Sequence, residues 1–118
     1  MGIEIVEKSG KLLTVKVSGK LKASELRQAQ NAAIEVIKSE GKIRVLVFGE
    51  NFQGWEKSDD WGDVSFQLKY DEHIERIAIV GTEKWEDLVS AFLGKGLREV
   101  PMKFFPQTQY AKARAWVA

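Results

Sequence analysis

The stretch that decides the fold is Glu75–Trp85, which reads ERIAIVGTEKW. Its centre, Ile77–Val80, is an unbroken apolar run, and such a run is typical of a strand that is covered on both faces, as in a parallel sheet. Gly81 ends the run, and Thr82 is a residue type that can cap a following helix. We therefore predict a buried central strand that leads directly into a helix.

On the N-terminal side of this strand, the sequence predicts two strands, a long helix and a third strand. Apolar and polar residues alternate along 3–5 and 13–17, and Gly10 between these segments favours a hairpin. Apolar residues at helical spacing run through 23–40 and predict an amphipathic helix. The apolar segment 43–48 then predicts a strand.

The segment 49–60 has the composition of a loop, because it contains two glycines, an asparagine, a serine and two consecutive aspartates. A helix is predicted to follow over about 61–70. Its apolar residues share two faces, with Trp61, Val64 and Leu68 on one and Phe66 and Tyr70 on the other.

Beyond the central strand, the sequence predicts a helix, a last strand and a terminal helix. Segment 85–93 has apolar residues at helical spacing throughout, and segment 110–117 carries a second such stripe. Between them, residues 100–104 alternate as a strand. Pro101 has no amide hydrogen to donate, so this strand is expected either at an edge of the sheet or with the Pro101 nitrogen facing outward.

The predicted order of elements is β-β-α-β-α-β-α-β-α. Strands that alternate with helices imply parallel pairing through right-handed crossovers, and the opening hairpin contributes one antiparallel strand. We therefore predict an α/β fold with a mixed, mainly parallel sheet of four to five strands and about four helices. With 118 residues, residues 1–118 are expected to form a single domain.

Composition excludes several classes of function. Eighteen basic residues against 17 acidic ones give a net charge of +1, which creates no general field for nucleic acid or an acidic membrane. The absence of cysteine excludes disulfides, thiolate metal sites and cysteine nucleophiles. No apolar stretch approaches the roughly 20 residues of a membrane span, and the N-terminus lacks the pattern of a signal peptide. The expectation is a cytoplasmic protein with no integral membrane segment and no nucleic-acid partner.

Reactive residues do not form a recognisable set. His73 is the only histidine, and no nucleophile, substrate-binding group or metal-ligand spacing accompanies it, so it is interpreted as a solvated loop residue. Carboxylates at Asp59, Asp60 and Asp63 are of the kind that binds hard cations, but we interpret them as a solvated first helical turn, where the helix dipole favours acidic residues. No catalytic residue, metal site or cofactor is predicted, and the protein is not expected to be an enzyme.

Aromatic residues are numerous for a chain of this length, with four Trp, six Phe and two Tyr. Trp85 and Trp116 lie on helical stripes and are predicted to belong to the core. Four others bracket the segment beyond the third strand, where open α/β sheets usually bind ligands: Phe52, Trp55, Trp61 and Phe66. Two interpretations of these four stay open, that they cover the edge of a small core or that they line a ligand pocket or interface.

Six segments together are similar to those of a known family. They are IRVLVF from Ile43, Gly54-Trp55, the helix around Trp61, ERIAIVG from Glu75, Glu83-Lys84-Trp85, and Ala115-Trp116-Val117. In these segments the chain resembles the SpoIIAA-like family of small bacterial proteins, which is related to the STAS domain of the sporulation anti-sigma-factor antagonist. The resemblance implies the same α/β fold and a regulatory or protein-interaction role.

Anti-sigma-factor antagonists of this type switch when a serine in an Asp-Ser-Ser-Gly turn after the third strand is phosphorylated. The matching region here, 56–61, reads EKSDDW and lacks that motif. Ser58 lies near the corresponding position, but a phosphate there would meet the like charges of Asp59 and Asp60. Ser58 is therefore interpreted as a helix cap rather than a phosphorylation site.

The leading hypothesis is a non-catalytic binding or interaction module, which takes a protein partner or forms a homodimer through the surface around Trp55, Trp61 and Phe66. The alternative is a small carrier or sensor that holds an apolar, lipid-like molecule beneath the same aromatic residues. This alternative comes from the resemblance, because distant relatives of the fold bind lipids or other apolar ligands.

Overall fold

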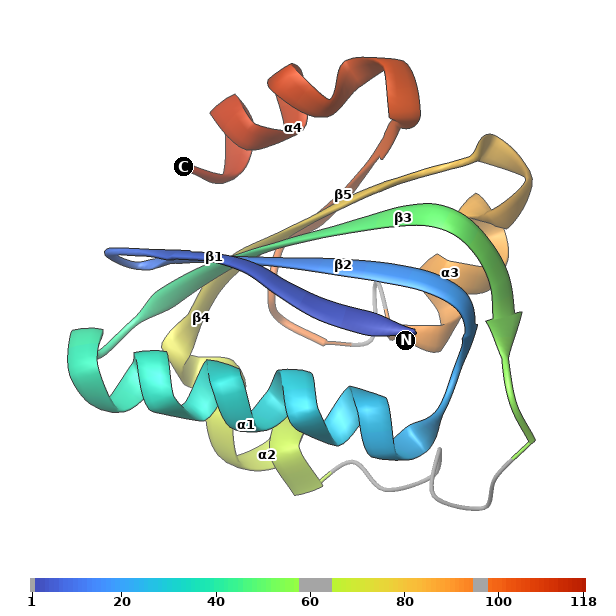
Figure 1. Cartoon of the computed structure of the whole chain (residues 1–118). Coiled ribbons are helices and arrows are strands. Elements are labelled where there is room, and N and C mark those ends of the chain that lie inside the picture. The colour runs from blue at the N-terminus through green and yellow to red at the C-terminus, as the bar shows by residue number, and fades with distance from the viewer. Residues whose placement is uncertain (1, 58–64, 95–97) are drawn as a thin grey trace.

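Five strands form one mixed sheet in the order β1-β2-β3-β4-β5 (Figure 1). The computed structural model describes residues 2–57, 65–94 and 98–118. β1 pairs with β2 in antiparallel orientation, and the other three pairings are parallel. The predicted α/β class and the mainly parallel sheet are confirmed. The strands are β1 (Ile3–Ser9), β2 (Leu12–Leu21), β3 (Ile43–Trp55), β4 (Ile74–Gly81) and β5 (Met102–Pro106).

Helices cover both faces of this sheet. Three of them, α1, α2 and α3, lie on one side, and α4 alone lies on the other (Figure 1). The α-helices are α1 (Ala23–Glu40), α2 (Ser65–Tyr70), α3 (Glu86–Phe92) and α4 (Tyr110–Val117), and three short 3-10 turns are η2 (Asp71–His73), η3 (Glu83–Trp85) and η4 (Gln107–Gln109).

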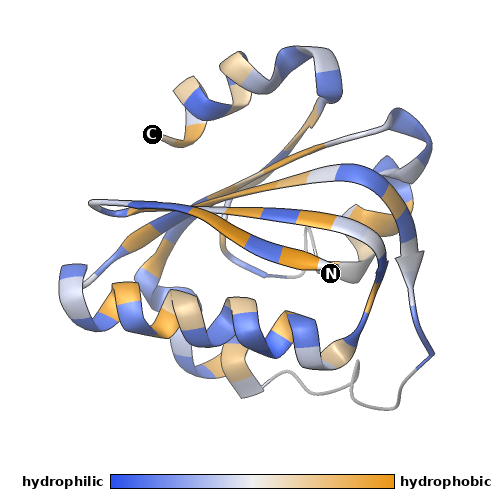
Figure 2. Ribbon diagram, viewed as in Figure 1, coloured by the Kyte–Doolittle hydropathy of each residue, from blue (hydrophilic) through white to orange (hydrophobic). Residues whose placement is uncertain are grey.

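The central strand β4 contributes to two separate apolar cores, one on each face of the sheet. Ile77 and Ile79 belong to the core beneath α1, whereas Ala78 and Val80 belong to the core beneath α4. All four are buried. Apolar residues accordingly recur along the central strands (Figure 2), and the prediction of a strand that is covered on both faces is confirmed.

The two edges of the sheet are formed as the sequence predicts. Gly10 has a φ of 56° in the turn between β1 and β2, as the predicted hairpin requires. β5 is an edge strand, and Pro101 comes directly before its first residue. Thr82 precedes η3, but its side chain makes no capping hydrogen bond, so its predicted capping role is wrong.

The loop predicted from residue 49 is wrong as far as residue 55, because β3 continues to Trp55. Its second half still pairs with the end of β2, with Gly19 opposite Phe52 and Leu21 opposite Trp55, although the register is irregular there. Asn51 and Gly54 adopt positive φ angles of 53° and 97°. Residue types that suggest a loop therefore let the strand bend while it stays paired.

Core positions at the predicted helices also need correction. α3 has seven residues and begins only at Glu86, so the predicted helix over 85–93 is too long. Leu88 is 55% exposed and Leu68 in α2 is 83% exposed. Trp85 and Trp116 are half-buried rather than buried. A helix of two turns presents too small an apolar face to bury a whole stripe against the sheet.

Candidate functional site

An apolar cavity of about 100 Å³ lies between the sheet and the helices α1 and α3, where β2, β3 and β4 approach their carboxyl ends. Phe52 and Trp55 from the bent end of β3 line it, together with Trp85, Val89 and Phe104. Apart from the Thr82 hydroxyl and the indole nitrogens, the lining residues that the structure describes offer no polar side-chain atoms. We call this space the aromatic cavity.

The aromatic side chains of this cavity pack on one another. The ring centroids of Phe52 and Trp85 lie 5.2 Å apart in an edge-to-face arrangement, and those of Phe52 and Trp55 lie 6.0 Å apart. Both separations are within the range of favourable aromatic pairs. Gly54 leaves room for this packing, because a Cβ atom there would lie 3.3 Å from Cη2 of Trp85.

A second cavity of about 140 Å³ adjoins the first and shares three lining residues with it, Leu26, Val47 and Leu93. Phe66 of α2 lines this second space, and its ring centroid lies 5.2 Å from that of Tyr70. Its wall contains two amide side chains and a guanidinium group, from Gln30, Gln67 and Arg98. We call it the mixed cavity.

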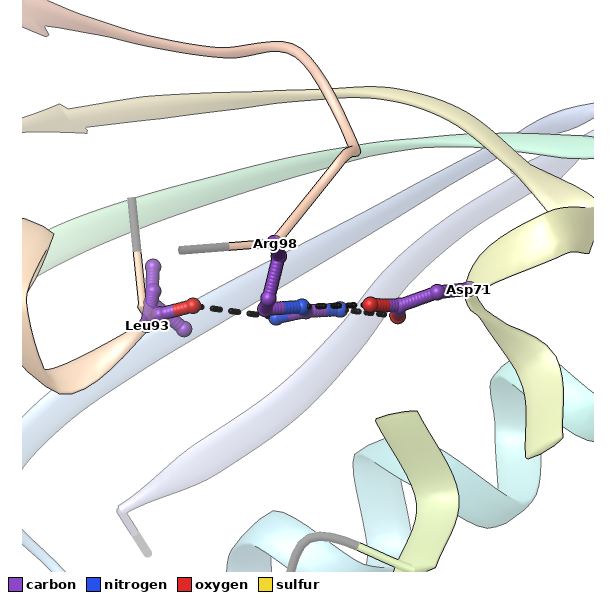
Figure 3. Close-up of polar contacts among 3 residues, drawn as sticks. All are labelled: Asp71, Leu93 and Arg98. Atoms are coloured by element: carbon purple, nitrogen blue, oxygen red, sulfur yellow. Dashed lines mark hydrogen bonds and ion pairs between the residues drawn. The ribbon is translucent and has the colours of Figure 1, made fainter. Parts of the chain in front are cut away.

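Arg98, which lines the mixed cavity, forms a partly buried ion pair with Asp71 (Figure 3). Arg98 Nε donates to Asp71 Oδ2 at 2.8 Å, and a second guanidinium nitrogen donates to Asp71 Oδ1. The third nitrogen donates to the backbone oxygen of Leu93 at 3.1 Å. With side chains only 11% and 22% exposed, Arg98 and Asp71 join the end of α3 to η2.

Sequence reasoning missed this ion pair and the two glutamines. Arg98 and Asp71 are 27 positions apart, and no local spacing connects them. Gln30 is one of several polar residues on α1, and Gln67 lies in a short helix. Only the packing of α1 and α2 over the sheet brings both amides to one cavity.

The predicted binding residues separate between the two cavities. Phe52 and Trp55 line the aromatic cavity, and Phe66 lines the mixed one. The remaining candidates, Trp61 and Ser58, and the carboxylates of Asp59, Asp60 and Asp63 lie outside the described residues.

His73 lies in η2 rather than in an open loop. Its Nδ1 is 3.2 Å from the backbone oxygen of Gly41, the residue that follows α1, and its Nε2 is 3.5 Å from a carboxylate oxygen of Glu72. These contacts place the imidazole between two elements of the scaffold, and it is not among the residues that line either cavity.

Within residues 2–57, 65–94 and 98–118, no group of three or more His, Asp or Glu side chains is arranged to hold a metal ion. In the same part of the chain, no helix combines the length and the apolar character that crossing a bilayer requires.

An ion pair on the opposite side of the sheet shifts the pKa of both its members. Arg114 of α4 donates to Oε1 of Glu7 in β1 at 2.8 Å. This hydrogen bond lowers the pKa of Glu7 below its ordinary value, and the carboxylate raises the pKa of Arg114. Both side chains are partly exposed, so the pair joins β1 to α4 without forming a reactive site.

Comparison with known proteins identifies relatives of this scaffold. A search of curated proteins gives no match. The chain is similar to the solved structure of an uncharacterized protein of the DUF3478 family from Shewanella loihica PV-4, which is described as having a SpoIIAA-like fold. The two structures superpose with a TM-score of 0.75 and have 22% sequence identity, and the match covers 99% of this chain and 94% of the other. Identity this low shows the fold alone. A family model described as SpoIIAA-like matches residues 12–118, and the chain therefore belongs to the SpoIIAA-like family.

Proposed function

We propose that the protein is a non-catalytic binding domain that holds an apolar small molecule in its aromatic cavity. The observation that carries this proposal is the cavity itself, which Phe52, Trp55 and Trp85 line near the carboxyl ends of β3 and β4. Open α/β sheets bind ligands beyond these strand ends, and small-molecule pockets are mostly lined by apolar and aromatic side chains.

The volume and chemistry of the cavity suit a small apolar group. An apolar cavity of about 150 Å³ stays free of water and binds benzene, and the aromatic and mixed cavities have volumes of about 100 and 140 Å³. A molecule that fills them gains dispersion contacts and removes apolar wall from water. Among the described residues, no histidine or carboxylate lines either cavity, which favours binding over acid–base catalysis.

The proposal can be tested with N-phenyl-1-naphthylamine, a neutral probe whose fluorescence rises in apolar surroundings. We expect the wild-type protein to increase the emission until about one probe is bound per chain. Val89→Phe places extra volume in the aromatic cavity and is expected to weaken uptake by about tenfold or more, which corresponds to roughly 1.4 kcal/mol.

Leu88→Phe is the matched control, because Leu88 neighbours Val89 on α3, is 55% exposed and does not line the cavity. Uptake by this control should stay within about twofold of wild type. Both variants need circular dichroism spectra like that of wild type, since extra core volume costs about 1–3 kcal/mol. Absence of uptake by the wild type, or equal weakening in the two variants, would contradict the proposal.

A homodimer or a protein partner is the second candidate, and exposed leucines favour it. Leu68 in α2 is 83% exposed and Leu88 in α3 is 55% exposed, and both helices cover the same face of the sheet (Figure 1). Exposed apolar side chains mark an interface when they form one contiguous patch, and the homodimer candidate assumes that these two leucines belong to such a patch.

Light scattering after size-exclusion chromatography tests the homodimer. A dimeric mass that becomes monomeric in Leu68→Glu, but not in the control Val6→Glu on β1, would support an interface at α2; Val6 is 47% exposed. A monomeric mass at every concentration would exclude the homodimer.

A further inference from the structure

We infer that the bound molecule is a neutral amphipathic compound, in which an apolar chain ends in one uncharged hydrogen-bonding head group such as an amide or an alcohol. The inference rests on the proposed function and adds the chemical class of the ligand. It also assigns Gln30 and Gln67 as the residues that bind the head group.

The walls of the two cavities differ in polarity in the same way as the two ends of such a molecule. Leu26, Val47 and Leu93 line both cavities, so the two spaces are neighbours, and the inference places one molecule across both. The aromatic cavity offers almost no polar atoms, which suits an apolar chain. In the mixed cavity, α1 and α2 each contribute a glutamine to the wall, and this end suits a polar group.

The two glutamine amides have hydrogen-bonding capacity to offer. Each carries a carbonyl acceptor and an NH₂ donor, and both side chains are half-buried. Within the described part of the chain, neither Gln30 nor Gln67 has a side-chain hydrogen bond. A head group that carries both a donor and an acceptor can hydrogen-bond to these two amides.

Charge decides against an ionised head group. Arg98 is the only ionised side chain that the described residues contribute to either cavity wall. Asp71 accepts two hydrogen bonds from its guanidinium group, and Leu93 accepts a third. The charge of Arg98 is therefore already balanced. An anionic head would approach Asp71, and any ion would lose hydration in a largely apolar space.

A displacement experiment with two ligands of equal chain length tests this inference. Octanamide and octanoate are titrated against N-phenyl-1-naphthylamine bound to the wild-type protein at about pH 8, where octanoate is ionised. We expect octanamide to displace the probe at a concentration about tenfold or more below that of octanoate.

Two variants then test the glutamines. Gln30→Leu and Gln67→Leu keep a similar side-chain volume but remove the amide. Each is expected to lower the affinity for octanamide by about three- to tenfold, because one hydrogen bond to the ligand is lost. The affinity of both variants for N-phenyl-1-naphthylamine should stay within about twofold of that of the wild type. The matched control is Gln28→Leu, which changes an exposed glutamine of the same helix that lines neither cavity and should leave octanamide binding unchanged.

Each possible result has a distinct meaning. Octanoate binding more tightly than octanamide would overturn the inference in favour of an anionic head at Arg98. Unchanged octanamide affinity in both leucine variants would overturn the role of the glutamines, yet leave the apolar-ligand function standing. Failure of the wild type to take up the probe would overturn the proposed function and this inference together. The comparison of octanamide with octanoate uses only the wild-type protein, so it tests whether the head group is neutral even if a leucine variant does not fold.

Discussion

At the residue scale, Gly54 and Trp85 explain how the aromatic cavity keeps its shape. Gly54 is buried, has a φ of 97° and would place a Cβ atom 3.3 Å from the Trp85 ring. Two independent constraints, a backbone conformation that side chains disfavour and the nearby indole, therefore favour glycine at this position. The ring of Trp85 also packs on Phe52, so strain at Gly54 would reach the cavity wall.

Gly54→Ala is expected to lower the free energy of unfolding by about 1–3 kcal/mol, because it combines backbone strain with displacement of the indole. Gly19→Ala is the control: Gly19 also has a positive φ, of 61°, but nothing lies within 4 Å of its added Cβ atom. This control should cost only about 1 kcal/mol. Urea denaturation measures both losses, and equal losses would mean that contact with Trp85 adds nothing.

At the element scale, ion pairs connect segments that are far apart in the sequence. Arg98 and Asp71 join the end of α3 to η2 in a largely buried position, whereas Arg114 and Glu7 join α4 to β1 in a more exposed one. Removing one partner of a buried pair leaves a charge without compensation, which costs far more than the loss of an exposed pair. The two pairs are therefore expected to differ in their importance for stability.

Asp71→Asn is expected to lower the free energy of unfolding by about 2 kcal/mol, since Arg98 then stays buried without its counter-charge. Asp71→Asn/Arg98→Met removes both charges and should recover part of this loss. Chemical denaturation of the two variants measures the difference. If the double variant is no more stable than Asp71→Asn, the cost does not come from an unpaired charge.

The pair of Glu7 and Arg114 predicts a pH dependence. The hydrogen bond from Arg114 holds the pKa of Glu7 below its ordinary value of 4.5 in the folded protein. The unfolded chain therefore binds this proton at a higher pH than the folded protein does, and the stabilisation is present above the unfolded pKa and disappears as pH falls through the folded one.

The stability difference between wild type and Glu7→Gln should accordingly shrink as the pH is lowered from about 6 to about 3. Arg114→Gln removes the same hydrogen bond and should show the same trend. Thermal unfolding across this pH range provides the measurement, and a difference that stays constant down to the lowest pH would contradict the assignment.

At the scale of the whole molecule, the sheet separates two apolar cores that share the same strands. β4 gives alternate residues to the core beneath α1 and to the core beneath α4. The radius of gyration of 13.1 Å agrees with about 13 Å for a domain of some 100 residues. Because neither core can lose its strands without disturbing the other, we expect the two to unfold together.

Urea unfolding is therefore predicted to occur in one cooperative transition, with a single midpoint by far-UV circular dichroism and by tryptophan fluorescence. Trp85 and Trp116 lie on opposite sides of the sheet, so the single-tryptophan variants that retain one or the other report on the two cores separately. Distinct midpoints for these variants would show that the cores unfold as independent units.

The sequence by itself determined the class of the fold, because its periodicities are properties of local segments. Alternation over 3–5 and 13–17 produced the hairpin, and the run Ile77–Val80 correctly indicated a strand covered on both faces. The sequence also predicted Phe52, Trp55 and Phe66 as candidate binding residues, because the sequence alone shows that aromatic residues follow the end of a strand. Whether these residues bind a ligand stays a prediction.

The tertiary structure alone decided the rest. Pairing with β2 carried β3 through a segment of loop composition as far as Trp55, because ladder hydrogen bonds outweigh local preference. Packing of α1 and α2 brought Gln30 and Gln67 to one cavity, and the fold brought Arg98 to Asp71. A cavity is the space left between packed layers, and its volume and polarity depend on contacts between distant segments that no local pattern encodes.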